Sequence, residues 1–67
     1  MDAQVSELNH QGYQILHSIG YPLRIPTITW LFSDIFGVID IVARNMISDL
    51  IDEGKLKNTG MGWIEVH

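Results

Sequence analysis

Cysteine is absent from this chain of 67 residues, proline occurs twice, and charged residues make up 18% of the chain. The lack of thiols excludes a disulfide, a thiolate metal site and a cysteine nucleophile. A chain of this length hides only about 60% of its unfolded surface when it folds. Its stability must therefore come from one compact core or from self-association, and we expect residues 1–67 to form a single domain.

Positive charge is scarce as well. The formal net charge is −4, because eight carboxylates outnumber the basic side chains, which are Arg24, Arg44, Lys55 and Lys57. A strongly basic chain would favour nucleic acid as a partner on charge alone. The acidic balance of this chain counts mildly against such a partner.

No apolar run is long enough for a membrane span, which needs about 20 nearly uncharged residues. The most apolar stretch, residues 28–46, is interrupted by Ser33, Asp34, Asp40, Arg44 and Asn45. The first residues of the chain show neither a basic leader nor an apolar segment, so no secretory or transit signal is evident. With 46% hydrophobic residues the composition is that of a globular protein. The sequence predicts a soluble protein of the cytoplasm without membrane contact.

Catalytic and metal-binding patterns are missing too. The chain has no phosphate-binding glycine loop, no nucleophile and base at a recognisable spacing and no pair of acids that would flank a cleft. His10 and His17 would lie about 10 Å apart on a helix, too far to share one metal ion. We therefore expect no enzyme activity, no metal, no cofactor and no small-molecule substrate.

Apolar side chains at helical spacing predict a first helix over residues 3–19. Asp2 is its expected N-cap and Gly20 its left-handed C-terminal residue. Gly12 lies on the inward face, where it would let another backbone approach closely. The other members of this face are Val5, Leu8, Ile15, Leu16 and Ile19.

Two prolines, Pro22 and Pro26, interrupt helical structure after this segment. The alternation of Leu23-Arg24-Ile25 between them predicts a very short strand at a sheet edge. Thr27 is the expected N-cap of a second helix over residues 28–36. Thr29, Ser33 and Asp34 fall on its outer side, and its inward face comprises Ile28, Leu31, Phe32, Ile35 and Phe36.

A third helix is predicted over residues 40–53, bounded by Gly37 before it and Gly54 after it. Its inward face comprises Ala43, Met46, Ile47, Leu50 and Ile51. Residues 55–66 then form a hairpin, with strands over 55–58 and 63–66 and a linker that contains Gly60 and Gly62.

Two local motifs give this order of elements a family resemblance. Phe36-Gly37-Val38 resembles the turn of a helix-turn-helix, in which apolar residues around a glycine close one helix and fill the core. Asp52-Glu53-Gly54-Lys55-Leu56 is similar to the junction between a recognition helix and the first wing strand. Residues 23–66 therefore resemble the winged helix-turn-helix family. The expected fold is α+β, with three helices, a short strand before the second helix and a C-terminal β-hairpin wing.

The resemblance implies a small DNA-binding transcriptional regulator. In this family the outward face of the third helix enters the major groove, and the wing contacts the DNA backbone or minor groove. That face would include Ile41, with Asp40 and Asp49 at its margins. Arg44 would pair with guanine, Asn45 with adenine, and Ser48 with a base or phosphate. Lys55 and Lys57 would lie at the base of the wing, near the DNA backbone, and Arg24 is a weaker phosphate candidate.

The chain departs from typical DNA binders of this family in two places. The start of the third helix carries apolar Ile41 and Val42 instead of basic or hydroxyl residues, and Met61 stands where a basic wing tip is usual. Even four phosphate contacts would give a salt slope of only about −4 per protomer. DNA binding therefore requires a dimer or a basic partner. The alternative is a winged-helix module that binds protein through Ile41, Val42 and Met61 without contacting DNA.

Overall fold

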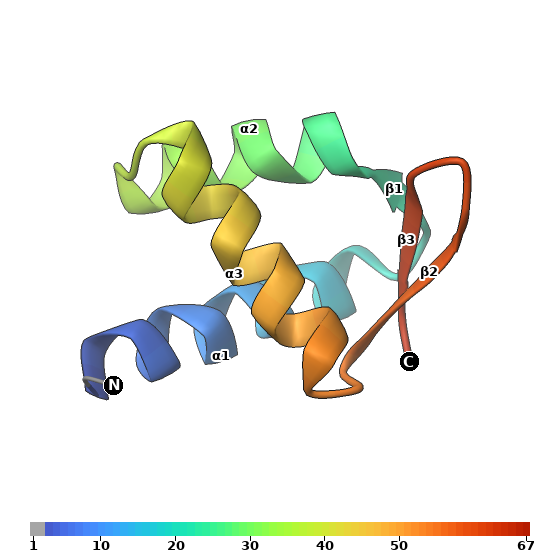
Figure 1. Cartoon of the computed structure of the whole chain (residues 1–67), viewed down its shortest axis with the longest axis horizontal. Coiled ribbons are helices and arrows are strands. Elements are labelled where there is room, and N and C mark those ends of the chain that lie inside the picture. Colours follow the sequence, from blue (N-terminus) through green and yellow to red (C-terminus); the bar gives the residue numbers. More distant parts are fainter. Residues whose placement is uncertain (1–2) are drawn as a thin grey trace.

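The computed structural model describes the backbone of residues 3–67 and the side chains of residues 7–67. The predicted N-cap Asp2 and the predicted inward side chain of Val5 lie outside this description. The elements are α1 (Ala3–Ile19), β1 (Leu23–Arg24), α2 (Ile25–Phe36), α3 (Asp40–Asp52), β2 (Leu56–Gly60) and β3 (Trp63–Val66) (Figure 1).

Helix α1 packs on the core through Gly12 and Leu16, both of which are buried. A Cβ atom on Gly12 would come within 2.9 Å of Cζ of Phe32, whose side chain is fully buried. The close approach expected at Gly12 is therefore made by an aromatic ring of α2 and not by a backbone segment. Gly20 ends the helix with φ 79°, as predicted for a left-handed C-terminal residue.

Helix α2 begins at Ile25, three residues before the predicted start, so Thr27 is not its N-cap. Arg24 takes the N-cap position with an extended backbone and no side-chain cap, and Pro26 lies in the first turn. Proline is tolerated there because the first helical N–H groups have no partner within the helix. The short strand predicted over residues 23–25 is correspondingly limited to Leu23 and Arg24.

The buried face of α2 differs from the predicted face at three positions. Leu31 is only half-buried and is not among the residues that pack on the core. Thr29 is buried, and its hydroxyl donates a 2.8 Å hydrogen bond to the carbonyl oxygen of Ile25. This bond removes the cost of burying a polar hydroxyl. Ile35 is 49% exposed, although the helical spacing places it inward. Phe32 is fully buried as predicted, and its ring packs against Phe36 at a centroid distance of 5.7 Å.

The turn between α2 and α3 has the geometry of a helix-turn-helix. Gly37 ends α2 with φ 65°, as the sequence predicts, and Val38 packs against the core. The chain direction bends by 114° between α2 and α3, within the range of about 90–120° for this motif. A hydrogen bond of 3.1 Å from the Ser33 hydroxyl to the Asp40 carboxylate also joins the two helices.

Helix α3 buries the predicted face, and Ala43, Met46, Ile47 and Leu50 are each at most 3% exposed. The helix ends at Asp52, one residue before the predicted end, with Glu53 as C-cap. Gly54 follows with φ 78°, and the amide of Lys55 donates to the carbonyl oxygen of Leu50. This is the glycine-based helix end that the sequence predicts.

The C-terminal hairpin joins β1 in a three-stranded antiparallel sheet with the order β1-β3-β2. The predicted linker over residues 59–62 is shorter in the structure, because β2 continues through Thr59 to Gly60 and only Met61 and Gly62 remain in the turn. Inward-facing Leu56 and Ile64 connect the sheet to the helical core.

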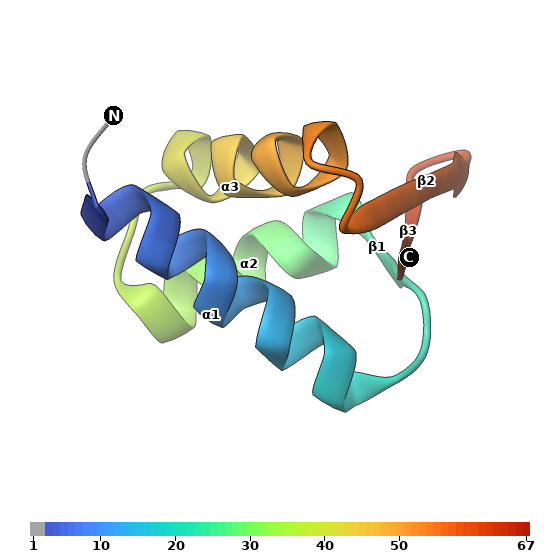
Figure 2. The same ribbon diagram turned by 90° about the horizontal axis from the view of Figure 1, so that it is seen from below.

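The three helices pack around one core, and the sheet lies at one end of the bundle (Figures 1 and 2). Figure 2 shows that α3 and the hairpin turn reach the same side of the molecule and that β2 is the edge strand nearest that side. The chain thus has an α+β, winged-helix-like fold. Among the described helices, none could cross a membrane alone; α2 and α3 pass the length and composition test only as a bent pair.

Candidate nucleic-acid interface

The outward face of α3 carries an exposed stripe that runs along the helix axis. Ile41, Asn45, Ser48 and Asp52 follow one another at intervals of four, three and four residues, and all four are exposed. This spacing keeps them within one narrow strip of the helix surface. Arg44 is exposed beside the stripe. The structure therefore brings together Arg44, Asn45 and Ser48, the residues predicted to read bases.

The two acids predicted at the margins of this face are held by neighbouring helices. Asp40 accepts the hydrogen bond from Ser33 on α2. Asp49 accepts a hydrogen bond of 3.2 Å from Nδ2 of Asn9 on α1, and Asn9 is only 4% exposed. Both carboxylates point toward partners at the edges of the helix, which leaves the centre of the face to the exposed stripe.

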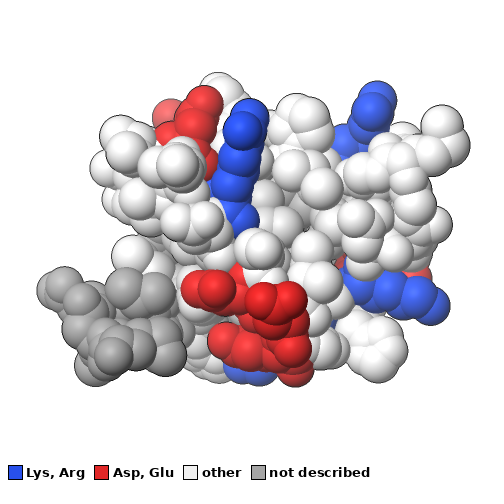
Figure 3. Space-filling view, in the orientation of Figure 1, with Lys and Arg blue, Asp and Glu red and all other residues white. Residues whose placement is uncertain are grey.

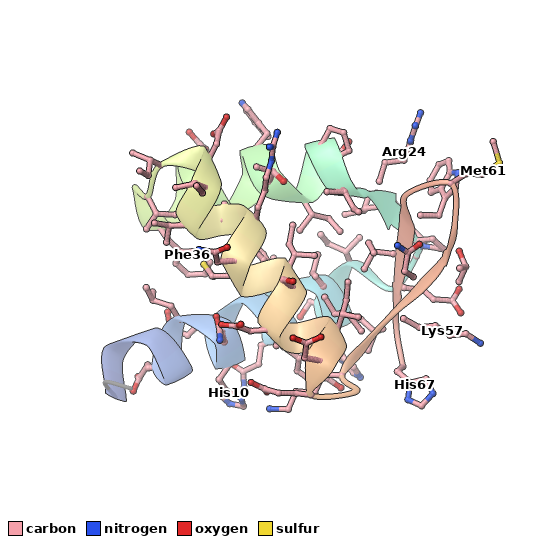
Figure 4. The ribbon with its side chains drawn as sticks, viewed as in Figure 1. His10, Arg24, Phe36, Lys57, Met61 and His67 are labelled. Carbon is pink, nitrogen blue, oxygen red and sulfur yellow. The ribbon has the colours of Figure 1, made fainter. Side chains whose placement is uncertain are left out.

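The sheet adds two more cationic side chains. Arg24 of β1 lies over the ring of Trp63, with its guanidinium carbon 5.9 Å from the ring centroid, within cation–π range. Lys57 of β2 is exposed and lies directly opposite Glu65 in the hairpin register. Figure 4 shows Arg24 and Lys57 extending outward from the sheet end of the molecule.

Lys55 lies directly before β2, at the base of the wing as predicted, and it has partners within the protein. Its Nζ is 3.4 Å from the Glu53 carboxylate, and this is the only salt bridge among the side chains that the structure describes. The same Nζ lies 5.9 Å from the centroid of the Tyr13 ring on α1. Lys55 thus has contacts with α1 and with the end of α3.

Acidic side chains share the α3 side of the molecule with Arg44. In Figure 3, which views this side, an acidic group covers the C-terminal part of α3, and separate basic side chains lie over α3 and over the sheet. Asp52 is the acid that stands in the exposed stripe itself, four residues after Ser48. Sequence reasoning assigned it to the helix end and missed this position, although the helical spacing from Asn45 and Ser48 reveals it.

Exposed apolar side chains gather at the start of α3. Ile39 is 69% exposed and Ile41 64% exposed, and Val42 is also exposed. Ile41 and Val42 were the predicted partner-binding residues on this helix, and Ile39 was not among them. Met61, the third predicted partner-binding residue, is 90% exposed at the hairpin turn and lies at the far edge of the molecule in Figure 4.

Two concave sites are lined by residues of α1 with α2 or β3 and not by α3. A half-open cavity of about 460 Å³ is bordered by the end of α1 and by β3, with Tyr13, His17 and Glu65 in its wall. A shallower apolar groove between α1 and α2 is lined by Ile15, Ile19 and Ile35. Within residues 3–67, no group of three histidine or acidic side chains is placed to hold a metal ion.

The candidate interface is thus an exposed helix face with cationic side chains beside it. Its polar centre comes from α3 and its cationic edge from the sheet. No protein-family model, curated protein or solved structure matches the chain.

Proposed function

We propose that this protein is a small DNA-binding transcriptional regulator that inserts α3 into the major groove. The proposal is carried by one observation. Arg44, Asn45 and Ser48 are all exposed on the outward side of a helix that follows a glycine turn at 114° to its predecessor. Helix-turn-helix proteins present their base-reading residues in this way.

Each side chain in the α3 face has a chemical role in this proposal. The guanidinium of Arg44 matches the two acceptors at the major-groove edge of guanine, and the amide of Asn45 matches the donor and acceptor of adenine. The Ser48 hydroxyl binds a base or a phosphate. Arg24 and Lys57 contact the DNA backbone, where point charges position the protein without reading sequence.

The small number of cations makes a homodimer part of the proposal. Lys55 is paired with Glu53 and Arg44 is assigned to a base, so Arg24 and Lys57 leave a protomer two phosphate contacts, with a salt slope of about −1.8. A symmetric dimer doubles these contacts and reads two half-sites about one helical turn apart. We therefore expect tight binding only to duplexes long enough for two protomers.

The test is fluorescence anisotropy with a labelled mixed-sequence duplex at about 50 mM salt, together with a measurement of the mass of the protein in solution. Arg44→Ala should weaken binding by about 10-fold, because a bidentate base contact is lost. Lys55→Ala is the matched control: it removes the same charge from a side chain held by Glu53 and should leave the affinity within about twofold. If the protein at tens of micromolar does not bind the duplex, the proposal is wrong.

A second candidate function rests on the apolar start of α3. Ile39 and Ile41 are each more than 60% exposed, and adjacent exposed apolar residues often mark a protein interface. In this alternative, the chain is a winged-helix module that binds protein through Ile41, Val42 and Met61 and does not contact DNA. The acidic net charge of −4 also favours it.

Ile41→Asp tests the protein-binding alternative, and duplex binding by the wild type separates that alternative from the DNA-binding proposal. Because Ile41 is 64% exposed, the substitution should change the free energy of unfolding by no more than about 0.5 kcal/mol. In the protein-binding alternative, Ile41→Asp abolishes the dimer or the capture of a partner protein. The wild type in that case does not bind DNA. A large fall in Tm would show that Ile41 supports the fold and would remove this argument.

A further inference from the structure

Met61 occupies an unusual backbone position for its residue type. It has φ 56° and is the only residue other than glycine with positive φ in the part of the chain that the structure describes. Together with Gly62, at φ 81°, it forms a two-residue hairpin turn with positive φ at both central positions. Such turns strongly favour asparagine or glycine at the first position. A methionine there keeps a large apolar side chain at a conformational cost.

The fold does not use this side chain. Met61 is 90% exposed, the highest exposure among the large hydrophobic residues described, and it is not part of the core or of the apolar residues packed against it. Figure 4 shows it projecting past the end of the hairpin. A strained position that holds an unburied apolar side chain points to a binding role.

The turn that carries Met61 is braced on both sides. The carbonyl oxygen of Gly62 accepts a 3.0 Å hydrogen bond from the amide of Ile25, the first residue of α2. Within the hairpin, the Thr59 hydroxyl donates to the carbonyl oxygen of Trp63, and the Gly60 amide donates to the Asn58 side chain. A register shift between Asn58 and Gly60 adds a bulge, which increases the local twist. The side chain therefore leaves the protein from a rigid support.

The surroundings of Met61 favour a polyanion over an apolar protein surface. Arg24 pairs with Trp63 in the sheet, two residues from Met61, and its guanidinium lies over the Trp63 ring. The neighbouring strand β2 carries Lys57, Asn58 and Thr59, all exposed and polar. Trp63 is itself 43% exposed, with the Arg24 guanidinium over its ring. Apolar side chains beside cationic and hydroxyl groups suit DNA, where phosphates surround a stack of apolar bases.

We propose that Met61 acts as an apolar wedge that enters the minor groove of bound DNA and partly unstacks one base step, which bends the duplex. This inference rests on the proposed DNA-binding function and adds to it a step that the α3 face does not supply. Methionine, leucine and similar side chains insert in this way in minor-groove architectural proteins. Pyrimidine–purine steps unstack most readily. We therefore expect Met61 to enter at a TA or CA step where the hairpin contacts the minor groove.

The test combines anisotropy with end-to-end energy transfer on a doubly labelled duplex that contains TA steps, across a range of salt concentrations. Met61→Asn keeps a residue suited to positive φ and removes the apolar side chain. It should lower the affinity by about 10-fold at every salt concentration, because apolar burial is lost. It should also reduce the bend and leave the salt slope unchanged, because no charge is removed. Met61→Leu keeps an apolar side chain and should bend the duplex as the wild type does.

The outcomes separate this inference from the proposed function. If the wild type binds the duplex and Met61→Asn binds equally tightly with the same bend, the wedge is wrong and the DNA-binding proposal stands. If Met61→Asn instead flattens the salt slope, the residue acts through the placement of charges and the wedge is also wrong. If the wild type binds no duplex, both proposals fail. The melting temperature of each variant shows whether its hairpin is still folded.

Discussion

At the scale of single residues, the contact between Gly12 and Phe32 determines how closely α1 and α2 pack. An added Cβ on Gly12 would lie 2.9 Å from Cζ of Phe32. The Phe32 side chain is fully buried, so its ring cannot move out into solvent. Gly12→Ala gains about 1 kcal/mol in helix propensity but forces overpacking that costs roughly 1–3 kcal/mol. We expect a net loss of about 1 kcal/mol in the free energy of unfolding, measured by urea denaturation.

The contact can be verified by a double-mutant cycle. Phe32→Leu shortens the side chain that meets the new methyl group, so the cost of Gly12→Ala should be smaller in the Phe32→Leu background than in the wild type. A Gly12→Ala variant more stable than the wild type would show that the two helices are not in contact there.

Single-residue features were predictable from the sequence where the residue type alone decides them. Gly37 and Gly54 have positive φ as expected, because glycine adopts that conformation without a steric penalty. The partners of Lys55 were not predictable, because one of them, Tyr13, lies on α1, far away in the chain. The same holds for the bond between Asn9 and Asp49.

At the scale of elements, α3 is the helix on which both the core and the candidate interface depend. Leu50 has no exposed surface and lies in the middle of the core cluster. Leu50→Ala should cost roughly 2–5 kcal/mol, enough to unfold a domain of this size. On the opposite side of the same helix, exposed Ser48→Ala should change stability by less than about 0.5 kcal/mol. Equal thermal melting curves for the two variants would contradict the assigned faces of α3.

Element boundaries were less predictable than element types. Pro26 and Thr27 both favoured a helix start after residue 26, but the first turn of α2 accommodates the proline and the helix begins at Ile25. In the hairpin, Thr59 and Gly60 have turn-forming character, yet pairing between Gly60 and Trp63 extends β2 through them. In both places a tertiary contact of the sheet, the bond from Ile25 to Gly62 or the pairing with β3, overrides the local preference.

Asp52 links the stability of α3 to its proposed function. Its carboxylate lies at the C-terminal end of the helix, where the helix dipole disfavours negative charge. It also stands in the stripe that would face DNA phosphates. Asp52→Asn should therefore raise stability by a few tenths of a kcal/mol and tighten duplex binding about two- to fivefold.

The control for Asp52→Asn is Glu7→Gln, which makes the same change in net charge on α1. Glu7 is exposed and lies within hydrogen-bond distance of Gln11, a residue of the groove between α1 and α2. Its substitution should leave duplex affinity unchanged. Equal tightening by both variants would show that total charge matters and that the position of Asp52 in the stripe does not.

At the scale of the whole molecule, the fold brings a polar helix face and the cationic side chains of a sheet to one side, within a protein of net charge −4. The winged-helix-like architecture was predictable because turn glycines and apolar spacing determine the order and packing of the elements. The balance of basic and acidic groups on the α3 side was not predictable, because it depends on which charged side chains contact α1. Lys55 is one such charge.

The most direct test of the account is the dependence of duplex affinity on salt concentration for the wild type, Lys57→Ala and Lys55→Ala. We predict a slope of about −1.8 per protomer for the wild type, a slope flatter by about 0.9 for Lys57→Ala and no change for Lys55→Ala. Equal slopes for Lys57→Ala and the wild type, or a flatter slope for Lys55→Ala, would contradict the proposed interface of α3 and the sheet.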